Sequence, residues 1–329
     1  MPPAKAVRGQ VDFRQTYADE FAGWPLKRQD RGHQVYGTFL NPTTGWPSGM
    51  PGLNVGYHKA IDILVDDSKG PQPILAIEGG VVHEATHSVQ VTPLKVRVNS
   101  GVVGIGHFRY AHCVPNVAVG QRVSAGDTIG HTVPGWWHTH LEEIAEIGGK
   151  RVLLNPLRPG GKLRPPGDKG KPRVEAMRVY AKTDENNPSA RVVPLDRIRG
   201  VVVPVALALD DFGMREWPGS PKSPLHVYRA SIRLTRETTV VQERTLFRID
   251  MAPGPTWQHF FRPLTRRSAP VAVCAVKKPK SCDGAFWIRL WEQGWDTRRV
   301  ANGRYELTVT VADTVGNEAS RTIQLRVAN

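Results

Sequence analysis

Short apolar runs separated by glycine and proline are the feature that most constrains the fold of this chain. Between residues 58 and 157 such runs occupy 61–65, 74–77, 81–82, 96–98 and 102–105. Runs of this length that end at turn-forming residues are typical of β-strands. In the segment 117–130 glycines lie between even shorter runs, which predicts tight corners. We therefore predict an all-β fold without long helices, beginning with a small antiparallel sheet of barrel-like or sandwich-like form.

A segment dense in proline, glycine and lysine, residues 161–173, divides the chain. Such composition marks a linker of limited flexibility, and 329 residues suit two domains. We predict a first domain over 1–160, whose residues 1–57 form a loop-rich approach segment, and a second over 174–329. The second holds alternating runs that predict a β-sandwich of seven or eight strands, at 174–180, 200–209, 226–234, 246–249, 271–276, 285–290, 305–312 and 320–327.

The last two of these runs are joined by a Gly316-Asn317 turn. This hairpin resembles the closing hairpin of bacterial immunoglobulin-like domains. Three tryptophans of the same domain, at 287, 291 and 295, either pack in its core or stack on sugar rings. Packing is the more frequent role of aromatic side chains in a β-sandwich.

The charge balance is basic, with 44 Lys and Arg against 30 Asp and Glu and a formal net charge of +14. This excess favours polyanionic partners such as nucleic acid, anionic lipid headgroups or acidic cell-wall polymers. Basic residues do not form a run interleaved with aromatics, which argues against nucleic acid. No stretch approaches the ~18 apolar residues of a membrane helix. The first twenty residues lack an apolar signal region, so we expect either a cytosolic protein or one whose export signal has been removed.

The three cysteines differ in their surroundings. Cys274 and Cys282 flank a tight loop that a disulfide could close in an oxidising compartment, and two free thiols are the equal alternative. Cys113 has no obvious partner, so we expect it to be a small buried hydrophobic residue.

Histidines are concentrated in the first part of the chain. Nine of the eleven precede residue 150, at 33, 58, 83, 87, 107, 112, 131, 138 and 140. His138 and His140 are one residue apart in a segment that reads as extended, so their imidazoles lie on one strand face. His58 and Asp62 have the same even spacing before a β-branched run. Two histidines and a carboxylate match the three protein ligands of a catalytic zinc site, which leaves its fourth position to water.

The surrounding motifs, taken in order, make this pattern specific. The chain resembles the lysostaphin or LytM-type family of zinc endopeptidases, whose pattern H-x-G-x-D, G-x-V, Y-x-H, V-x-V-G-x-x-V-x-x-G-x-x-I-G, H-x-H-x-E and N-P it follows over about residues 30 to 160. The matching segments are 57–62, 74–82, 110–112, 117–130, 138–142 and 155–156.

The resemblance implies one zinc ion per chain, bound by His58, Asp62 and His140. It also implies that His112 and His138 are catalytic histidines that do not bind the metal and flank the water and the scissile carbonyl. The implied activity is hydrolysis of peptide bonds in peptidoglycan cross-links or stem peptides by a secreted or periplasmic monomer. The alternative is a non-catalytic wall-binding module of the same fold that positions or activates another hydrolase.

The sequence departs from the family pattern in two places. Ala60 stands where the family has glycine, and Trp136-Trp137 replaces small residues before the histidine pair. The tryptophans narrow or line the cleft, so they bear on peptide preference more than on the chemistry. Glu142 either orients a histidine ligand from behind or faces solvent.

Overall fold

Regular structure is almost entirely β-strand in the computed structural model, which describes residues 23–39, 42–44, 55–91, 96–98, 100–182, 192–211, 224–252 and 286–329. The 3-10 helices η2 (Asp67–Lys69) and η4 (Thr297–Arg299) are single turns. The all-β prediction is confirmed. Within the described ranges, no helix is long and apolar enough to cross a membrane.

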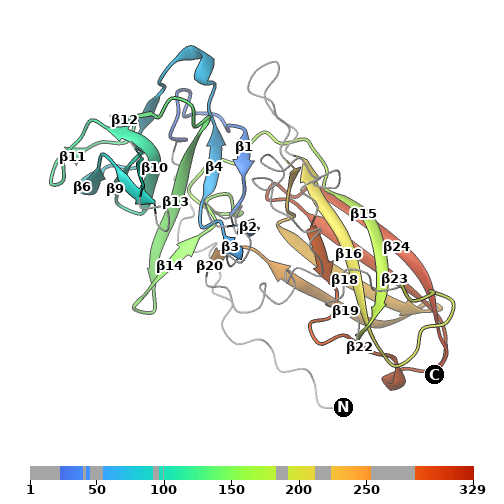
Figure 1. The fold of residues 1–329 in the computed structure, drawn as a ribbon. Coiled ribbons are helices and arrows are strands. Elements are labelled where there is room, and N and C mark those ends of the chain that lie inside the picture. The colour runs from blue at the N-terminus through green and yellow to red at the C-terminus, as the bar shows by residue number, and fades with distance from the viewer. Residues whose placement is uncertain are drawn as a thin grey trace.

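The first region is built on one large antiparallel sheet, at one end of the molecule in Figure 1. Its central path runs β1 (Val35–Gly37), β4 (Ile61–Leu64), β13 (His138–Ile147), β10 (Phe108–Pro115), β9 (Gly101–Ile105), β6 (Gly80–Thr86) and β11 (Arg122–Val123). Four short strands join this path, namely β5 (Pro73–Leu75), β12 (Thr128–Thr132), β14 (Lys150–Leu154) and β20 (Met251–Ala252). Two small hairpins stand apart: β2 (Pro42–Thr44) pairs with β3 (Val55–Tyr57), and β7 (Val89–Val91) pairs with β8 (Val96–Val98).

Strand β13 shows how this sheet separates its core from its functional face. Its residues alternate between buried and half-buried from His138 to Ala145, as the period of two in a strand requires. Leu141 pairs with Tyr110 of β10, and both side chains are fully buried. The neighbouring His140 points to the opposite face.

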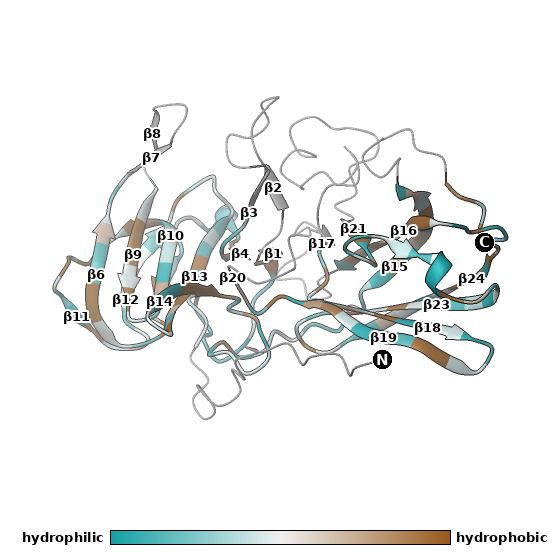
Figure 2. Cartoon of the chain, turned by 90° about the horizontal axis from the view of Figure 1, so that it is seen from below, coloured by the Kyte–Doolittle hydropathy of each residue, from teal (hydrophilic) through white to brown (hydrophobic). Residues whose placement is uncertain are grey.

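The second region consists of two antiparallel sheets that share a buried core. One contains β15 (Arg173–Ala181), β16 (Val201–Asp211), β17 (Pro224–Leu225), β21 (Phe286–Arg289) and β22 (Trp295–Asp296). The other has the order β19 (Thr239–Arg248), β18 (Arg229–Arg236), β23 (Gly303–Ala312) and β24 (Glu318–Val327). Hydrophobic and hydrophilic residues alternate along many of these strands (Figure 2).

The hairpin predicted around Gly316 and Asn317 joins β23 to β24. Gly316 has φ 94°, a conformation that glycine adopts without a steric penalty. Asp313 Oδ1 accepts hydrogen bonds from the backbone nitrogens of Val315, Gly316 and Asn317. One buried carboxylate therefore organises the whole turn.

Residues 161–173, which the sequence marks as a linker, are anchored to both regions. Trp24 of the first region donates its indole N–H to Arg164 O at 3.0 Å. Asn317 of the closing hairpin donates to Gly170 O at 2.8 Å. Strand β20, which follows β19 in the chain, pairs with β14 and so extends the sheet of the first region.

The tryptophan side chains that the structure describes in the second region are buried. Trp287, Trp291 and Trp295 are at most 7% exposed, so they pack in the core. Cys113 is buried and free, as expected. The predicted strand at 271–276 and the Cys274–Cys282 loop lie outside the described residues.

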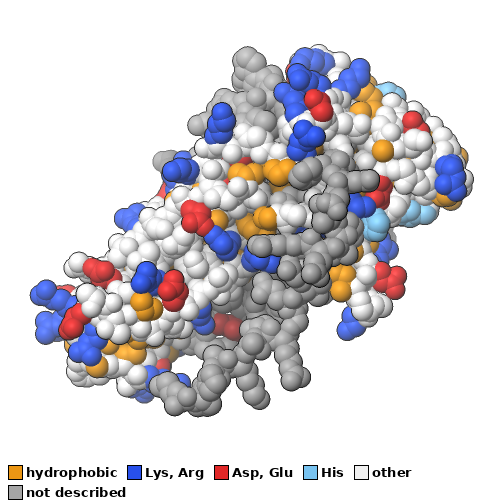
Figure 3. Space-filling model, turned by 180° about the vertical axis from the view of Figure 1, so that it is seen from behind, with side chains coloured by type: hydrophobic (Ala, Val, Ile, Leu, Met, Phe, Trp, Pro, Cys, Tyr) orange, Lys and Arg blue, Asp and Glu red, His pale blue; other side chains and the backbone are white. Residues whose placement is uncertain are grey.

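Lys and Arg side chains occur at both ends of the face shown in Figure 3, with Asp and Glu among them.

Candidate metal centre

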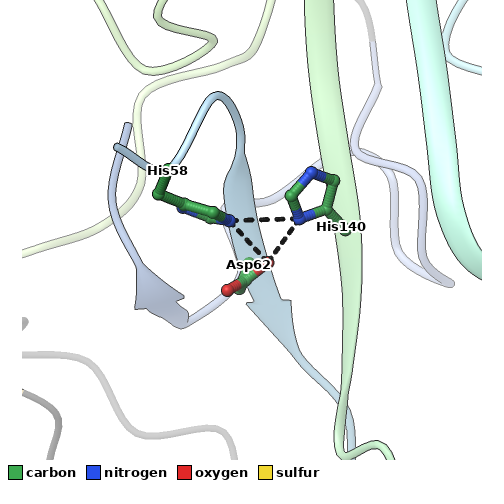
Figure 4. A group of neighbouring side chains, drawn as sticks. All are labelled: His58, Asp62 and His140. Carbon is green, nitrogen blue, oxygen red and sulfur yellow. Dashed lines mark hydrogen bonds and ion pairs between the residues drawn. The ribbon is translucent and has the colours of Figure 1, made fainter. Parts of the chain in front are cut away.

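Strands β4 and β13 bring the candidate ligands together. They pair antiparallel, with Asp62 opposite His140 and Leu64 opposite His138. His58 lies just before β4 and turns its ring back toward the same point (Figure 4). His138 and His140 lie on one strand face, as their even spacing predicted, whereas His58 is outside β4 and reaches the same point from the residues that precede this strand.

The three donor atoms are spaced as a zinc site requires. Asp62 Oδ1 lies 2.9 Å from His140 Nδ1 and 3.2 Å from His58 Nε2, and the two nitrogens are 3.1 Å apart. Ligands about 2.0–2.1 Å from a tetrahedral zinc ion are about 3.3 Å from one another. The donor set of two imidazoles and one carboxylate, half-buried and closely spaced, therefore fits zinc.

Contacts behind the ligands fix the orientation of both imidazoles. His58 Nδ1 lies 3.0 Å from Thr38 O, a carbonyl that can only accept, so the proton is on Nδ1 and Nε2 faces the cluster. His140 Nε2 lies 3.5 Å from Glu142 Oε1. Such outer contacts hold metal-binding histidines in place in many metalloproteins.

Glu142 belongs to a longer line of charges. It accepts from Arg109 at 3.2 Å, and the same guanidinium donates to Glu84 at 2.8 Å. Arg109 and Glu142 are cross-strand partners on β10 and β13. Of the two roles left open for Glu142, the structure thus favours contact with His140.

The structure separates His138 from His140. His138 Nε2 is 3.7 Å from Asp62 Oδ1, and this histidine is outside the group of three possible ligands. Its Nδ1 donates to Trp136 O at 2.6 Å. The ring of His112 lies 4.9 Å from that of His138 and 5.4 Å from that of His140, measured between centroids. All five histidine and aspartate residues chosen from the sequence are therefore neighbours.

His112 has a strained backbone. Its φ is 58°, which is uncommon for a residue other than glycine, and it sits where the pairing of β10 with β9 shifts register between Ala111 and Cys113. Its ring packs on Trp136 at 4.1 Å between centroids and its Nδ1 lies 3.0 Å from Ser100 Oγ. Strain of this kind occurs where surrounding contacts enforce a functional orientation.

Burial and the neighbouring charged or hydrogen-bonding groups shift the pKa values of these side chains in opposite directions. Burial lowers the pKa of His112 to about 2, so this ring is neutral. Burial also disfavours the charge on His140, but hydrogen bonds to Asp62 and Glu142 outweigh it and raise the pKa of His140 to about 9. Despite burial, the nearby imidazoles of His58 and His138 hold the pKa of Asp62 well below its usual range.

These directions predict a pH-dependent affinity for zinc. In the metal-free protein His140 is protonated below about pH 9, and this proton must leave before its nitrogen can bind a metal. Apparent zinc affinity is therefore expected to rise about tenfold per pH unit between pH 7 and 9 and then level off. Competition with a chelator of known proton affinity measures it. Glu142→Gln removes one cause of the raised pKa and should move the plateau to lower pH, whereas a flat profile in both proteins would contradict the assignment.

Asp67 contributes to this site but could not be found from the sequence. Asp67 Oδ2 accepts hydrogen bonds from the backbone nitrogens of Gly135 and Trp137, at 2.9 and 3.1 Å. Trp137 has φ 56° and is 64% exposed. Asp67 thereby holds the turn that carries Trp136, whose carbonyl orients His138. No spacing motif marks this aspartate, because it contacts backbone atoms of a distant segment.

A second group of possible metal ligands, all three of them aspartates, lies elsewhere in the described part of the chain. Asp168, Asp210 and Asp313 have ligand atoms within 4.8 Å of one another. Asp313 already accepts four hydrogen bonds within the closing hairpin, three from backbone nitrogens and one from the Asn317 amide. Its role in that turn accounts for its burial.

The chain matches no family model, no curated protein and no solved structure. The interpretation of the site therefore rests on its own geometry and chemistry.

Proposed function

We propose that this protein is a zinc-dependent endopeptidase that hydrolyses peptide bonds in peptidoglycan cross-links or stem peptides, in the cell envelope or outside the cell. The observation that carries the proposal is the cluster of three donors, His58, Asp62 and His140, beside two histidines that do not belong to it. Three protein ligands leave a coordination position for water. The net charge of +14 favours a setting rich in anionic wall polymers.

Each of the two other histidines has a defined task in such a reaction. When bound, zinc would lower the pKa of a coordinated water toward about 7 and polarise the scissile carbonyl. His138 donates from Nδ1 to Trp136 O, so its Nε2 is free to accept a proton. Ser100 can donate to Nδ1 of the neutral His112, which leaves an Nε2 proton to stabilise the developing oxyanion.

Aromatic side chains form part of the surroundings of these histidines. Tyr36 stacks on His138 with ring centroids 6.2 Å apart, and Trp136 packs on His112. Burial raises the pKa of Tyr36, so its hydroxyl stays protonated. We propose that these rings and the exposed Trp137 restrict which peptides reach the metal.

The test is digestion of purified peptidoglycan and of cross-linked muropeptides by the zinc-loaded protein, with products identified by mass spectrometry. His138→Ala is expected to retain zinc and to lose about 10²–10⁴-fold in hydrolysis, because a general base is removed and no ligand is. His131→Ala, at an exposed histidine of β12, is the matched control and should keep full activity.

Two results would count against the proposal. Zinc binding without turnover of any wall peptide would favour the non-catalytic module instead. Full activity of His138→Ala would remove the role given to that residue.

A further inference from the structure

His226 connects the second region to the loop that supports the metal centre. It follows β17 and is only 4% exposed. Its Nε2 lies 2.9 Å from the backbone oxygen of Phe39, a residue 187 positions earlier that is completely buried. Its Nδ1 lies 2.9 Å from Val227 O.

The loop that His226 contacts follows β1, and the residues from Gly37 to Phe39 contact either the metal ligands or His226. A Cβ on Gly37 would lie 2.6 Å from Asp62 Oδ2, so only glycine fits against this carboxylate. Thr38 O holds the His58 ring through Nδ1. Phe39 O is the atom that faces His226.

The length of β1 makes this contact important. The strand has three residues and pairs with β4 at Val35 and Gly37, with a register shift between them. Beyond Gly37 this pairing no longer holds the backbone. The hydrogen bond from His226 and the burial of the Phe39 side chain therefore restrain the Thr38 carbonyl.

We propose that His226 is a positioning residue of the metal centre, through which the C-terminal region holds the Thr38–Phe39 backbone and thereby the His58 ring. This inference rests on the metal site of the proposed function, and it deepens that function by giving the C-terminal region a part in metal binding. The contact requires a proton on Nε2, because a carbonyl oxygen only accepts. We assign the one N–H of the neutral imidazole to this nitrogen rather than to Nδ1, whose carbonyl neighbour is that of the next residue, Val227. A side chain with an N–H at the same place can replace it, and an apolar one cannot.

The test measures zinc affinity of full-length variants by chelator competition. His226→Leu is expected to bind zinc about tenfold more weakly, the lower end of the effect of contacts behind metal ligands. His226→Gln, whose amide nitrogen can replace Nε2, should restore affinity to within about twofold of the wild type. Tyr228→Phe is the matched control, because it removes the neighbouring hydrogen bond to Asp250 and leaves the His226–Phe39 contact in place, and its affinity should not change.

The outcomes separate this inference from the proposed function. Zinc affinity of folded His226→Leu equal to that of the wild type would overturn the inference, whatever the protein hydrolyses. Equal weakening by Leu, Gln and the Tyr228→Phe control would overturn it as well, because the effect would then reflect general loosening of the junction. If the leucine variant does not fold, His226→Asn, too short to reach Phe39 O, makes the same comparison with glutamine. Failure of the wild type to hydrolyse wall peptides would affect the proposed function alone.

Discussion

Replacing Asp62 with alanine is expected to weaken zinc binding by about 10²–10³-fold. Its Oδ1 is the one oxygen of the three-donor cluster and is within 3.2 Å of both ligand nitrogens. Structural zinc sites with four ligands bind with about 10–16 kcal/mol, so one ligand accounts for about 2.5–4 kcal/mol. At 1.4 kcal/mol per factor of ten, this gives the expected loss. Isothermal titration or chelator competition at pH 7.5 measures it.

The control for this variant is Asp66→Ala. Asp66 is an aspartate of the same segment, but its carboxylate pairs with Ser68 and Lys69 and does not face the cluster. Its removal should leave zinc affinity within about twofold of the wild type, since surface ion pairs contribute little. Asp62→Asn keeps the shape and one acceptor but not the charge, so its affinity should lie between those of Asp62→Ala and the wild type. Unchanged affinity in Asp62→Ala would mean that zinc is bound elsewhere.

The parts of this site that could be predicted from the sequence are those that depend on short spacing. The period of two along a strand puts His138 and His140 on one face, whatever the rest of the fold. The same reasoning does not account for His58, which lies before β4 and reaches Asp62 by turning its ring back toward the sheet. Whether the strand face of His138 and His140 lies next to Asp62 depends on the pairing of β4 with β13. Only the order of the surrounding motifs indicated that pairing.

Other contacts that position the site residues are made by backbone atoms, which a residue of any type can supply. The carbonyls of Thr38 and Trp136 orient His58 and His138, respectively. Asp67 and His226 act on the site through backbone groups that are distant in sequence. Periodicity cannot reveal such contacts, because they depend on the packed positions of loops rather than on side-chain chemistry.

The fold likewise has parts that local sequence patterns predicted and parts that they did not. Alternation and turn residues predicted the hairpin of β23 and β24, because its strands pair with a short connection. The pairing of β14 with β20 joins segments about a hundred residues apart, and β20 is only two residues long. Too few residues carry this pairing for a pattern to appear. The strand β19 begins seven residues before the predicted 246–249 run, because its outer half is exposed and lacks apolar alternation.

The Asn155-Pro156 motif has a structural explanation in the ion pair that follows it. Asn155 Oδ1 accepts from the backbone of Leu157 at 3.0 Å, and its Nδ2 donates to Ile249 O at 2.8 Å. The turn that results carries Arg158 onto Glu143 of β13. The two side chains form a bidentate pair, at 2.7 and 2.8 Å, without solvent exposure.

Replacing Arg158 with leucine is expected to lower the free energy of unfolding by about 3–5 kcal/mol, because it leaves the Glu143 carboxylate buried without its cation. Urea unfolding of the metal-free protein measures the loss. The double variant Arg158→Leu/Glu143→Leu should recover most of it, since the cost comes from the unpaired charge.

The control is Arg229→Leu, which breaks an exposed Arg–Glu pair, with Glu318, and should cost less than about 1 kcal/mol. Equal destabilisation by both arginine variants would show that burial of the first pair has no special effect. Because Glu143 lies three residues beyond His140 on β13, a loss confined to Arg158→Leu would also show that the strand carrying the metal ligand is held from the core side by this pair.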